Sequence, residues 1–381
     1  MDSPFIYNAP VSGKNFIGRR QDSIILQNLL NQGEHVALWE PPKTGISSLI
    51  RHALFNMSIG AKPFITVELS LMSVRTLEEF LLRIGSALIR SIAATPMEYA
   101  EVAERFLRGT HFVFDEKLYS ARDEVLSLNW TPDDDDIHAL LVMPFKIAEA
   151  RGQKLYLILN DFQNVSFTED PMSILRPLDD ILRTARSRDC SFIFTDSMVN
   201  AMQAIFVGSR LFHRVVSRVK LSEVDDRDIT DHINKGFLSS GKVVTNKDQL
   251  QGACRLLRCN LWYVNQFASF CDAMSKGYIM EPAMVDALNC LIAVHEPRFT
   301  AIMNSLTTHQ VNLLRAIEDG ITHFSTAEVI RKYSLNSSAN VNRVKEALMK
   351  KEVITFVDSD TPVILDALFE YWLKTYYFEN K

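Results

Sequence analysis

Residues 35–50 read HVALWEPPKTGISSLI, a strand pattern followed by a short loop and then by a helix pattern. The apolar run HVALWE is typical of a buried strand, and ISSLIRHALF carries apolar residues at helical spacing. A strand, a short loop and a helix in this order are where a phosphate-binding loop belongs. The segment therefore predicts an α/β fold built around a loop of that kind.

The loop keeps only part of the phosphate-binding motif, Gly-x-x-x-x-Gly-Lys-Ser/Thr. In that motif the glycines let backbone N–H groups wrap the phosphates, the lysine reaches the β- and γ-phosphates, and the hydroxyl ligates magnesium. Here Glu40 takes the place of the first glycine, and Ile46 takes that of the lysine. Gly45 and Ser47 keep the second glycine and the hydroxyl. Two of the four defining positions therefore survive.

A second altered motif ends another predicted strand. In proteins with a working phosphate loop, a buried strand usually ends in an Asp that serves magnesium, followed by a Glu that activates water. Here the apolar strand LYLIL is followed by Asn160 and Asp161. An amide thus replaces the magnesium-associated carboxylate, and the second acid is one methylene shorter.

Length and composition limit the class of protein. The chain has 381 residues, which suggests two or three domains. Its formal net charge of −5 excludes a strongly basic nucleic-acid-binding protein as a description of the whole chain. The sequence has no long apolar run and no basic-then-apolar signal segment, and its five cysteines form no CxxC pair. We expect a cytoplasmic protein with reduced cysteines and no membrane partner.

Further strand patterns alternate with helix patterns and predict a parallel sheet. Strands are expected at residues 63–70, 154–161, 191–197 and 218–224. Residues 94–132 are expected to hold helical stretches. The acidic run from Asp133 to Asp136 is interpreted as the solvated first turn of a helix that ends at Gly152.

The C-terminal part changes character twice. It is predicted to be all-helical from about residue 225, and from about residue 305 it shows three helix patterns and a two-stranded hairpin. The second of these helices is expected to be capped by Ser325, and the third by Ser337 or Ser338. Three helices and a hairpin form the winged-helix arrangement. The expected domains are a core with an N-terminal strap at residues 1–223, a helical lid at residues 224–298 and a winged helix at residues 299–381.

The order of these segments resembles the archaeal-type ATPases of prokaryotes, P-loop NTPases close to the AAA+ and STAND groups. That family has a Phe-x-Gly-Arg start, a glycine-rich phosphate loop, an Asp-Glu-Phe-Gln strand end, a Thr/Ser-Gly-Ser strand end and a C-terminal winged helix. The resemblance covers essentially the whole chain and rests on NFIGRRQDSIILQNLL (15–30), WEPPKTGISSLI (39–50), LYLILNDFQN (155–164) and FIFTDSMVNAMQAIF (192–206). It implies an α/β P-loop NTPase core with a parallel sheet, followed by an all-helical lid domain and a C-terminal winged helix.

The resemblance implies ATP or ADP, with Mg²⁺, as the ligands of the loop. By position, Gly45, Ser47 and Ser48 would offer backbone N–H groups and a hydroxyl. Lys43 would be the nearest substitute for the missing lysine. Ser47 would also face magnesium.

Other family positions carry alternatives that the sequence leaves open. Asn160 would lie on the magnesium side, and Asp161 would occupy the position of the catalytic Glu. Arg19 would contact adenine or close the strap, and Arg214 would sense phosphate or lie on the surface. Trp262 is interpreted as core packing.

Magnitudes favour a degenerate nucleotide site. A lost charge-assisted bond to phosphate costs about 1.5–3 kcal/mol. An ionised Glu40 about 5 Å from a phosphate would cost roughly 3 kcal/mol at an effective dielectric of about 20. Together these losses weaken triphosphate binding by about 10³-fold or more.

Three functions follow from these patterns. The first is a non-hydrolysing binding or regulatory module with a protein partner. The second is an atypical ATPase in which Lys43, Arg214 or a second chain in an oligomer supplies the missing charge. The third is a DNA-binding regulator that uses the Ser337–Lys351 helix, where bases exceed acids.

Overall fold

The computed structural model describes residues 4–60, 62–117, 124–185, 187–357 and 361–379. The chain divides into two compact units. The sheet unit comprises Gln21–Glu40 and His52–Leu221, and the helical unit comprises the chain up to Arg20, the segment Pro41–Arg51 and Ser222 onward. The phosphate-loop segment therefore belongs to a different unit from the strand that precedes it.

The sheet unit is built on five parallel strands in the order β2-β5-β6-β1-β7, which confirms the predicted parallel sheet. Every residue of β1 and β6, two of the three inner strands, is buried, as expected for strands covered on both faces. The strands are β1 (His35–Trp39), β2 (Phe64–Ser70), β5 (Lys154–Asn160), β6 (Cys190–Asp196) and β7 (Val216–Arg218).

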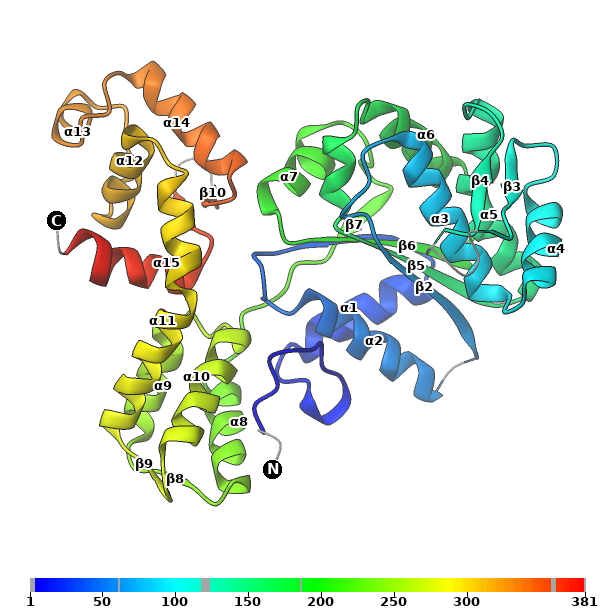
Figure 1. Ribbon diagram of the computed structural model, residues 1–381. Coiled ribbons are helices and arrows are strands. Elements are labelled where there is room, and N and C mark those ends of the chain that lie inside the picture. Colours follow the sequence, from blue (N-terminus) through cyan, green and yellow to red (C-terminus); the bar gives the residue numbers. More distant parts are fainter. Residues whose placement is uncertain (1–3, 61, 118–123, 186, 358–360, 380–381) are drawn as a thin grey trace. The chain divides into compact units, whose positions relative to one another are not determined.

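Helices cover both faces of this sheet. Figure 1 shows α1 and α2 on one face, and α3, α5 and α6 on the other. The apolar spacing that predicted α2 and α3 is thus used to cover the strands. The helices are α1 (Arg20–Asn31), α2 (Ile46–Gly60), α3 (Leu77–Ile92), α4 (Pro96–Phe106), α5 (Asp134–Arg151), α6 (Met172–Thr184) and α7 (Val199–Gln203), which continues to Gly208.

Two predictions for the sheet unit were partly wrong. The fifth strand was expected at residues 218–224, but β7 spans Val216–Arg218, because its pairing with β1 runs only from His35 to Ala37. Residues 94–132 contain the predicted helix in α4, but also an antiparallel pair formed by β3 (Phe112–Phe114) and β4 (Leu126–Leu128). Strands of three residues carry too little alternation to be recognised in a sequence.

The acidic run does begin a helix, but it is not fully solvated. Asp133 caps α5 in a capping box with Asp136, and Gly152 ends the helix in the left-handed conformation, as predicted. The Asp136 side chain, however, is only 1% exposed. Its Oδ1 accepts the N–H of His111 at 2.7 Å, and its Oδ2 lies 2.8 Å from Nδ1 of His111. This buried carboxylate joins the helix start to the segment before β3.

The helical unit contains α8 (Asp226–Ser239), α9 (Lys247–Leu256), α10 (Leu261–Met274) and α11 (Glu281–Asn304). Figure 1 shows these four helices together, in green to yellow. The prediction of an all-helical segment missed one feature. Val243–Val244 (β8) and Tyr278–Ile279 (β9) form a short parallel pair.

The winged-helix arrangement is present, with the third helix capped by Ser337 as predicted. The second helix is capped by Thr326 and not by Ser325. The hairpin strands are followed by a short helix that the sequence did not predict. The elements are α12 (Thr308–Glu318), α13 (Ala327–Lys332), α14 (Ser338–Lys350), β10 (Ile354–Phe356), β11 (Pro362–Ile364) and α15 (Ala367–Trp372), which continues to Phe378.

Within the described residues, no single helix is both long and apolar enough to cross a membrane. The bent pair of α3 and α4 reaches the required length and composition only when the two helices are taken together.

Candidate functional site

The phosphate-loop segment makes a tight turn between β1 and α2. Gly45 has a φ of +106°, which a residue with a side chain rarely adopts, and Lys43 also has a positive φ of +67°. Thr44 closes the turn by donating from its N–H and its hydroxyl to the carbonyl of Pro41, at 3.3 and 2.8 Å. The first helical hydrogen bond of α2 runs from the N–H of Leu49 to the carbonyl of Gly45. The residues between them therefore carry the N–H groups that a helix leaves without internal partners.

Glu40, at the position of the first motif glycine, is held in the sheet unit. Its carboxylate accepts the N–H of Leu221 at 3.2 Å. The guanidinium of Arg218 lies 4.2 Å from the ring centroid of Trp39, where its charge also attracts Glu40. The Glu40 side chain thus links the segment after β1 to the segment after β7, beyond the last backbone pair of the two strands.

Arg19 is bonded to two backbone carbonyls. Its Nε donates to the carbonyl of Ser222 at 2.7 Å, and its Nη1 donates to the carbonyl of Thr44. A Cβ built on Gly45 would lie 3.0 Å from the same Nη1. Of the two roles left open by the sequence, these contacts favour closure of the strap.

Lys43 lies against an aromatic ring of the helical unit. Its Nζ is 5.3 Å from the ring centroid of Trp262. The ring of Trp262 also lies 5.2 Å from that of His295 in α11. Trp262 is partly buried. One of its contacts is Lys43, which the sequence suggested as the substitute for the missing lysine.

Ser47 and Ser48 differ in their surroundings. Ser47 is exposed at the first turn of α2. The hydroxyl oxygen of Ser48 accepts the N–H of Val11 at 3.2 Å. One turn further on, Nη1 of Arg51 donates to the carbonyl of Pro10 at 3.2 Å. The helix start is thus tied to the N-terminal strap by side chains on its own first turns.

The second motif lies where the strands of the sheet end. Asn160 donates through Nδ2 to Glu68 at 2.9 Å, and its Oδ1 accepts the hydroxyl of Thr195 at 2.6 Å. Both ends of the amide are therefore bonded to neighbouring strands. Glu68 and Thr195 were not predicted as part of this site, although the polar ends of neighbouring parallel strands are the signal that could have found them.

Asp161 is turned toward the edge strand β2. It has a φ of +58°, and its Oδ2 accepts the hydroxyl of Ser70 at 2.5 Å. Next to it, Asp196 accepts the backbone N–H groups of Gln163, Ser197 and Met198. Burial raises the pKa of Asp196 to about 6 against the effect of these hydrogen bonds, and the charge of Asp161 adds to the rise.

Arg214 lies at the other end of the strands. It has a φ of +62° in the exposed turn before β7, and Val216 of β7 pairs with His35, the first residue of β1. The strands are parallel, so this turn is at the edge where they begin. Asn160 and Asp161 are at the edge where they end. The structure therefore does not bring Arg214 together with the second motif.

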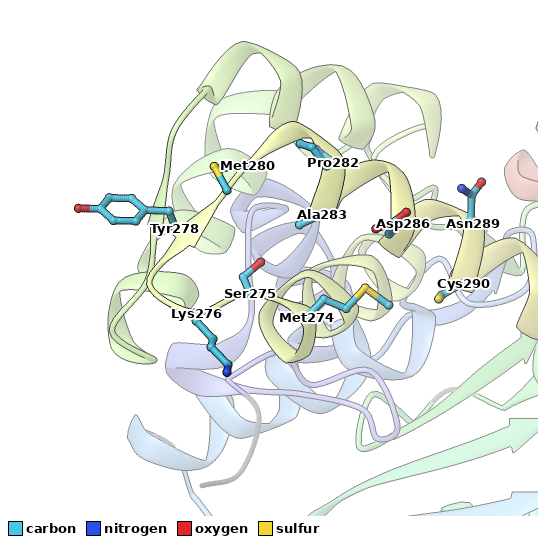
Figure 2. Close-up of a pocket in the computed structure, with 10 residues that line it drawn as sticks. All are labelled: Met274, Ser275, Lys276, Tyr278, Met280, Pro282, Ala283, Asp286, Asn289 and Cys290. Carbon is cyan, nitrogen blue, oxygen red and sulfur yellow. The ribbon is translucent and has the colours of Figure 1, made fainter.

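An open hollow of about 820 Å³ lies elsewhere in the helical unit, around β9 and the start of α11 (Figure 2). No residue of either motif lines it. Figure 2 shows the side chain of Tyr278 extending away from the other lining residues. The lining residues are Met274, Ser275, Lys276, Tyr278, Met280, Pro282, Ala283, Asp286, Asn289 and Cys290.

Comparisons with known proteins agree with this architecture. Residues 297–375 match the family described as a probable winged helix domain. No curated protein matches the sequence. Among solved structures, the Walker-type ATPase of Pyrococcus abyssi has a TM-score of 0.67 at 17% identity, with 97% of this chain and 99% of that chain covered.

Two ORC proteins of Aeropyrum pernix have the same architecture. ORC2, solved in ADPNP–ADP complexes, has a TM-score of 0.57 at 14% identity, with 96% of this chain and 93% of that chain covered. ORC1, solved in complex with DNA, has a TM-score of 0.51 at 10% identity, with 99% and 97% covered. The chain therefore has the fold of these archaeal ATPase-type proteins, a parallel sheet with helices and a C-terminal winged helix, as the resemblance predicted.

Proposed function

We propose that this chain, which has the fold of archaeal Walker-type ATPases, is a non-hydrolysing binding or regulatory module with a degenerate nucleotide site. One observation carries the proposal. Ile46 occupies the position of the phosphate-binding lysine, and the two nearby cations, Arg19 and Lys43, are engaged by carbonyls and by an indole ring. In this function the chain binds a protein partner and does not hydrolyse ATP.

The residues present do not fit a magnesium triphosphate. The apolar Ile46 cannot neutralise phosphate charge, and catalysis of phosphoryl transfer depends mainly on positioning and charge neutralisation. Asn160 is neutral, and both ends of its amide are bonded to Glu68 and Thr195. The carboxylate of Asp161 is bonded to the hydroxyl of Ser70. We therefore assign no catalytic step to these groups.

The test is calorimetric titration of the full chain with ATP and with ADP, each with and without magnesium. We expect no binding tighter than about millimolar, since the loss of the lysine contact and the Glu40 charge together weaken affinity by about 10³-fold. Micromolar binding with magnesium-dependent turnover that Asp161→Ala abolishes would overturn the proposal.

A matched set of variants separates a degenerate site from a misfolded one. Ile46→Lys restores the motif lysine, and the double variant with Glu40→Gly also restores the first glycine. Because the Glu40 carboxylate accepts the N–H of Leu221, Glu40→Gln is the control that removes the charge and keeps an oxygen acceptor. If the double variant binds nucleotide and the wild type does not, the result supports an intact fold around a site that has lost nucleotide binding.

The runner-up function is an atypical ATPase with a substitute cation. The position of Arg214, at the edge where the strands begin, weighs against that residue. Lys43→Ala tests the other version of this hypothesis, in which Lys43 supplies the missing charge. If Lys43 binds phosphate, this variant weakens nucleotide affinity, and an unchanged affinity eliminates that form.

DNA binding is a second candidate, favoured by one exposed helix face. On α14, Asn342, Arg343 and Lys350 are exposed. The similar fold of ORC1 was solved in complex with DNA. Two other bases on this segment are already engaged, since Lys345 lies 5.0 Å from the ring of Phe324, and Lys351 donates to the carbonyl of Ser305.

The DNA test is a duplex titration at several salt concentrations. Phosphate contacts release counterions, so Arg343→Ala is expected to weaken binding and to lower the salt dependence by about one unit of slope. Glu346→Ala is the matched control on the same exposed face. Binding that is absent, or that does not respond to salt, removes this candidate.

A further inference from the structure

The phosphate-loop segment is fastened to the helical unit by side chains of the protein itself. Although it connects β1 to α2 in the sequence, the segment Pro41–Arg51 belongs to the helical unit. Arg19 bonds the carbonyls of Thr44 and Ser222, and Lys43 lies over the ring of Trp262. We call Arg19, Lys43 and Trp262 the loop latch.

The N-terminal side of the latch is a clamp of hydrogen bonds. Arg19 reaches one carbonyl inside the loop and one at the beginning of the C-terminal part of the chain. A charged donor makes stronger hydrogen bonds than a neutral one. The bonds from Val11 to Ser48 and from Arg51 to Pro10 hold the strap on the same helix start.

The other side of the latch is the cation over the indole. Trp262 stands in the first turn of α10, where its backbone N–H donates to the side-chain oxygen of Asn260 at 3.0 Å. His295 of α11 lies beside the ring, and His295 Nε2 is 3.1 Å from the side-chain oxygen of Gln266. The ring that Lys43 contacts is therefore held by two helices.

The contacts continue from Trp262 to the C-terminal helix. The neighbouring Tyr263 donates from its hydroxyl to Asp366 at 2.8 Å, and Arg298 donates to both Tyr263 and Asp366. Asp366 also caps α15 by accepting the N–H groups of its first turn. A contiguous set of contacts thus runs from the loop to the end of the winged helix, all within the helical unit.

We propose that the loop latch couples the phosphate-loop segment to α10 and α11 without a nucleotide. The inference rests on the proposed function, and it names the groups that hold the loop when phosphate binding has been lost. The physical reason is that Arg19 and Lys43, the two cations at the loop, contact groups of the protein itself. A phosphate bound at the loop would have to compete with these contacts. A contiguous network alone does not establish coupling, so the test measures both ends.

Hydrogen–deuterium exchange of the nucleotide-free full chain is the test. Lys43→Met keeps most of the stem and removes the charge. A cation–π contact at an exposed site is worth about a two- to fivefold change in equilibrium, so we expect amides in residues 43–50 and in residues 258–266 both to exchange about two- to fivefold faster. Lys62→Met, the same change at an exposed lysine outside the latch, is expected to alter neither segment.

The reciprocal variant tests the other end. Trp262→Leu is expected to speed exchange in residues 43–50, whereas Trp262→Phe keeps an aromatic face and is expected to leave this segment closer to the wild type. The proposal is overturned if Lys43→Met affects residues 43–50 alone. It is also overturned if Trp262→Leu leaves those residues unchanged.

The same samples with added MgATP and MgADP keep the two proposals distinguishable. Protection of residues 43–50 by either nucleotide would count against the degenerate site. The latch is judged only from the nucleotide-free samples, so its outcome stands in either case.

Discussion

Individual polar and charged side chains at the loop and at the strand ends are bonded within the protein. Glu40 accepts the backbone N–H of Leu221, in the segment that follows β7, and Asn160 is bonded at both ends of its amide. Asp196 is the most constrained, because a carboxyl that is 5% exposed accepts three backbone N–H groups. Such a group makes the stability of the fold depend on pH.

The raised pKa of Asp196 gives that dependence a sign. The carboxyl binds its proton more tightly in the folded protein, with a pKa of about 6 against the ordinary 3.8. Its contribution to stability is therefore complete below about pH 4 and is lost as the pH rises through about 6. The difference corresponds to about 3 kcal/mol, at about 1.4 kcal/mol per pKa unit.

Asp196→Asn is expected to remove this pH dependence. The amide cannot titrate, but its Nδ2 would face the N–H of Gln163 and lose one hydrogen bond. We expect the variant to be less stable than the wild type near pH 4 and to close most of that gap near pH 7. Urea unfolding at both pH values measures the change. The exposed Asp189→Asn serves as a control, and a gap that stays constant with pH would contradict the prediction.

At the scale of elements, α5 shows how one helix start fixes a neighbouring segment. The capping box of Asp133 and Asp136 satisfies the first N–H groups of the helix. Asp136 also binds the backbone and ring of His111. The hydrogen bond to Asp136, together with the charges of Asp136 and Asp133, raises the pKa of His111. The start of α5 and the segment before β3 therefore depend on the same carboxylate.

His111→Ala is expected to lower stability more at acidic than at alkaline pH. Because the folded-state pKa of His111 is raised, its charged form stabilises the fold below the ordinary value of 6.5, and this contribution is lost as the pH rises through the raised pKa. Unfolding midpoints from pH 5.5 to pH 8.5 measure the effect. His138→Ala, an exposed histidine on α5, is the control. An equal loss at both ends of the range would contradict a role for the charged form.

At the scale of the whole molecule, the boundary predicted between the lid and the winged helix falls inside a continuous helix. Residues 298 and 299 lie in α11, which runs from Glu281 to Asn304. Phe299, on the winged-helix side, is fully buried, and its ring lies 6.3 Å from that of His295 on the lid side and 5.4 Å from that of Phe369 in α15. One hydrophobic core therefore includes side chains from both sides of the predicted boundary.

Phe299→Ala is expected to destabilise the helical unit by about 3–5 kcal/mol, the usual cost of removing a buried aromatic ring. Since the core is shared, hydrogen exchange should accelerate in α10 and in α15 together. Val294→Ala, at an exposed position of the same helix, is the control and should cost less than about 0.5 kcal/mol. Acceleration confined to α15 would show that the two segments are separate folding units.

The sequence by itself determined the local structure and the residue types at the motif positions. Apolar spacing and caps predicted the principal strands and helices, because the preference of each short segment depends on its own residues. The same reading located Glu40, Ile46, Asn160 and Asp161 at altered motif positions. Short strands such as β3 and β8 escaped it, because two or three residues carry no measurable period.

Only the tertiary structure decided where those side chains are bonded. Arg19 meets Ser222 across 203 residues, and Glu40 meets Leu221 across 181. Such partners depend on strand order and on helix packing, which no local pattern contains. The placement of Arg214 at the opposite edge from Asn160 follows in the same way from parallel pairing. The sequence shows which groups are present, and the long-range contacts determine which of them remain available for a ligand.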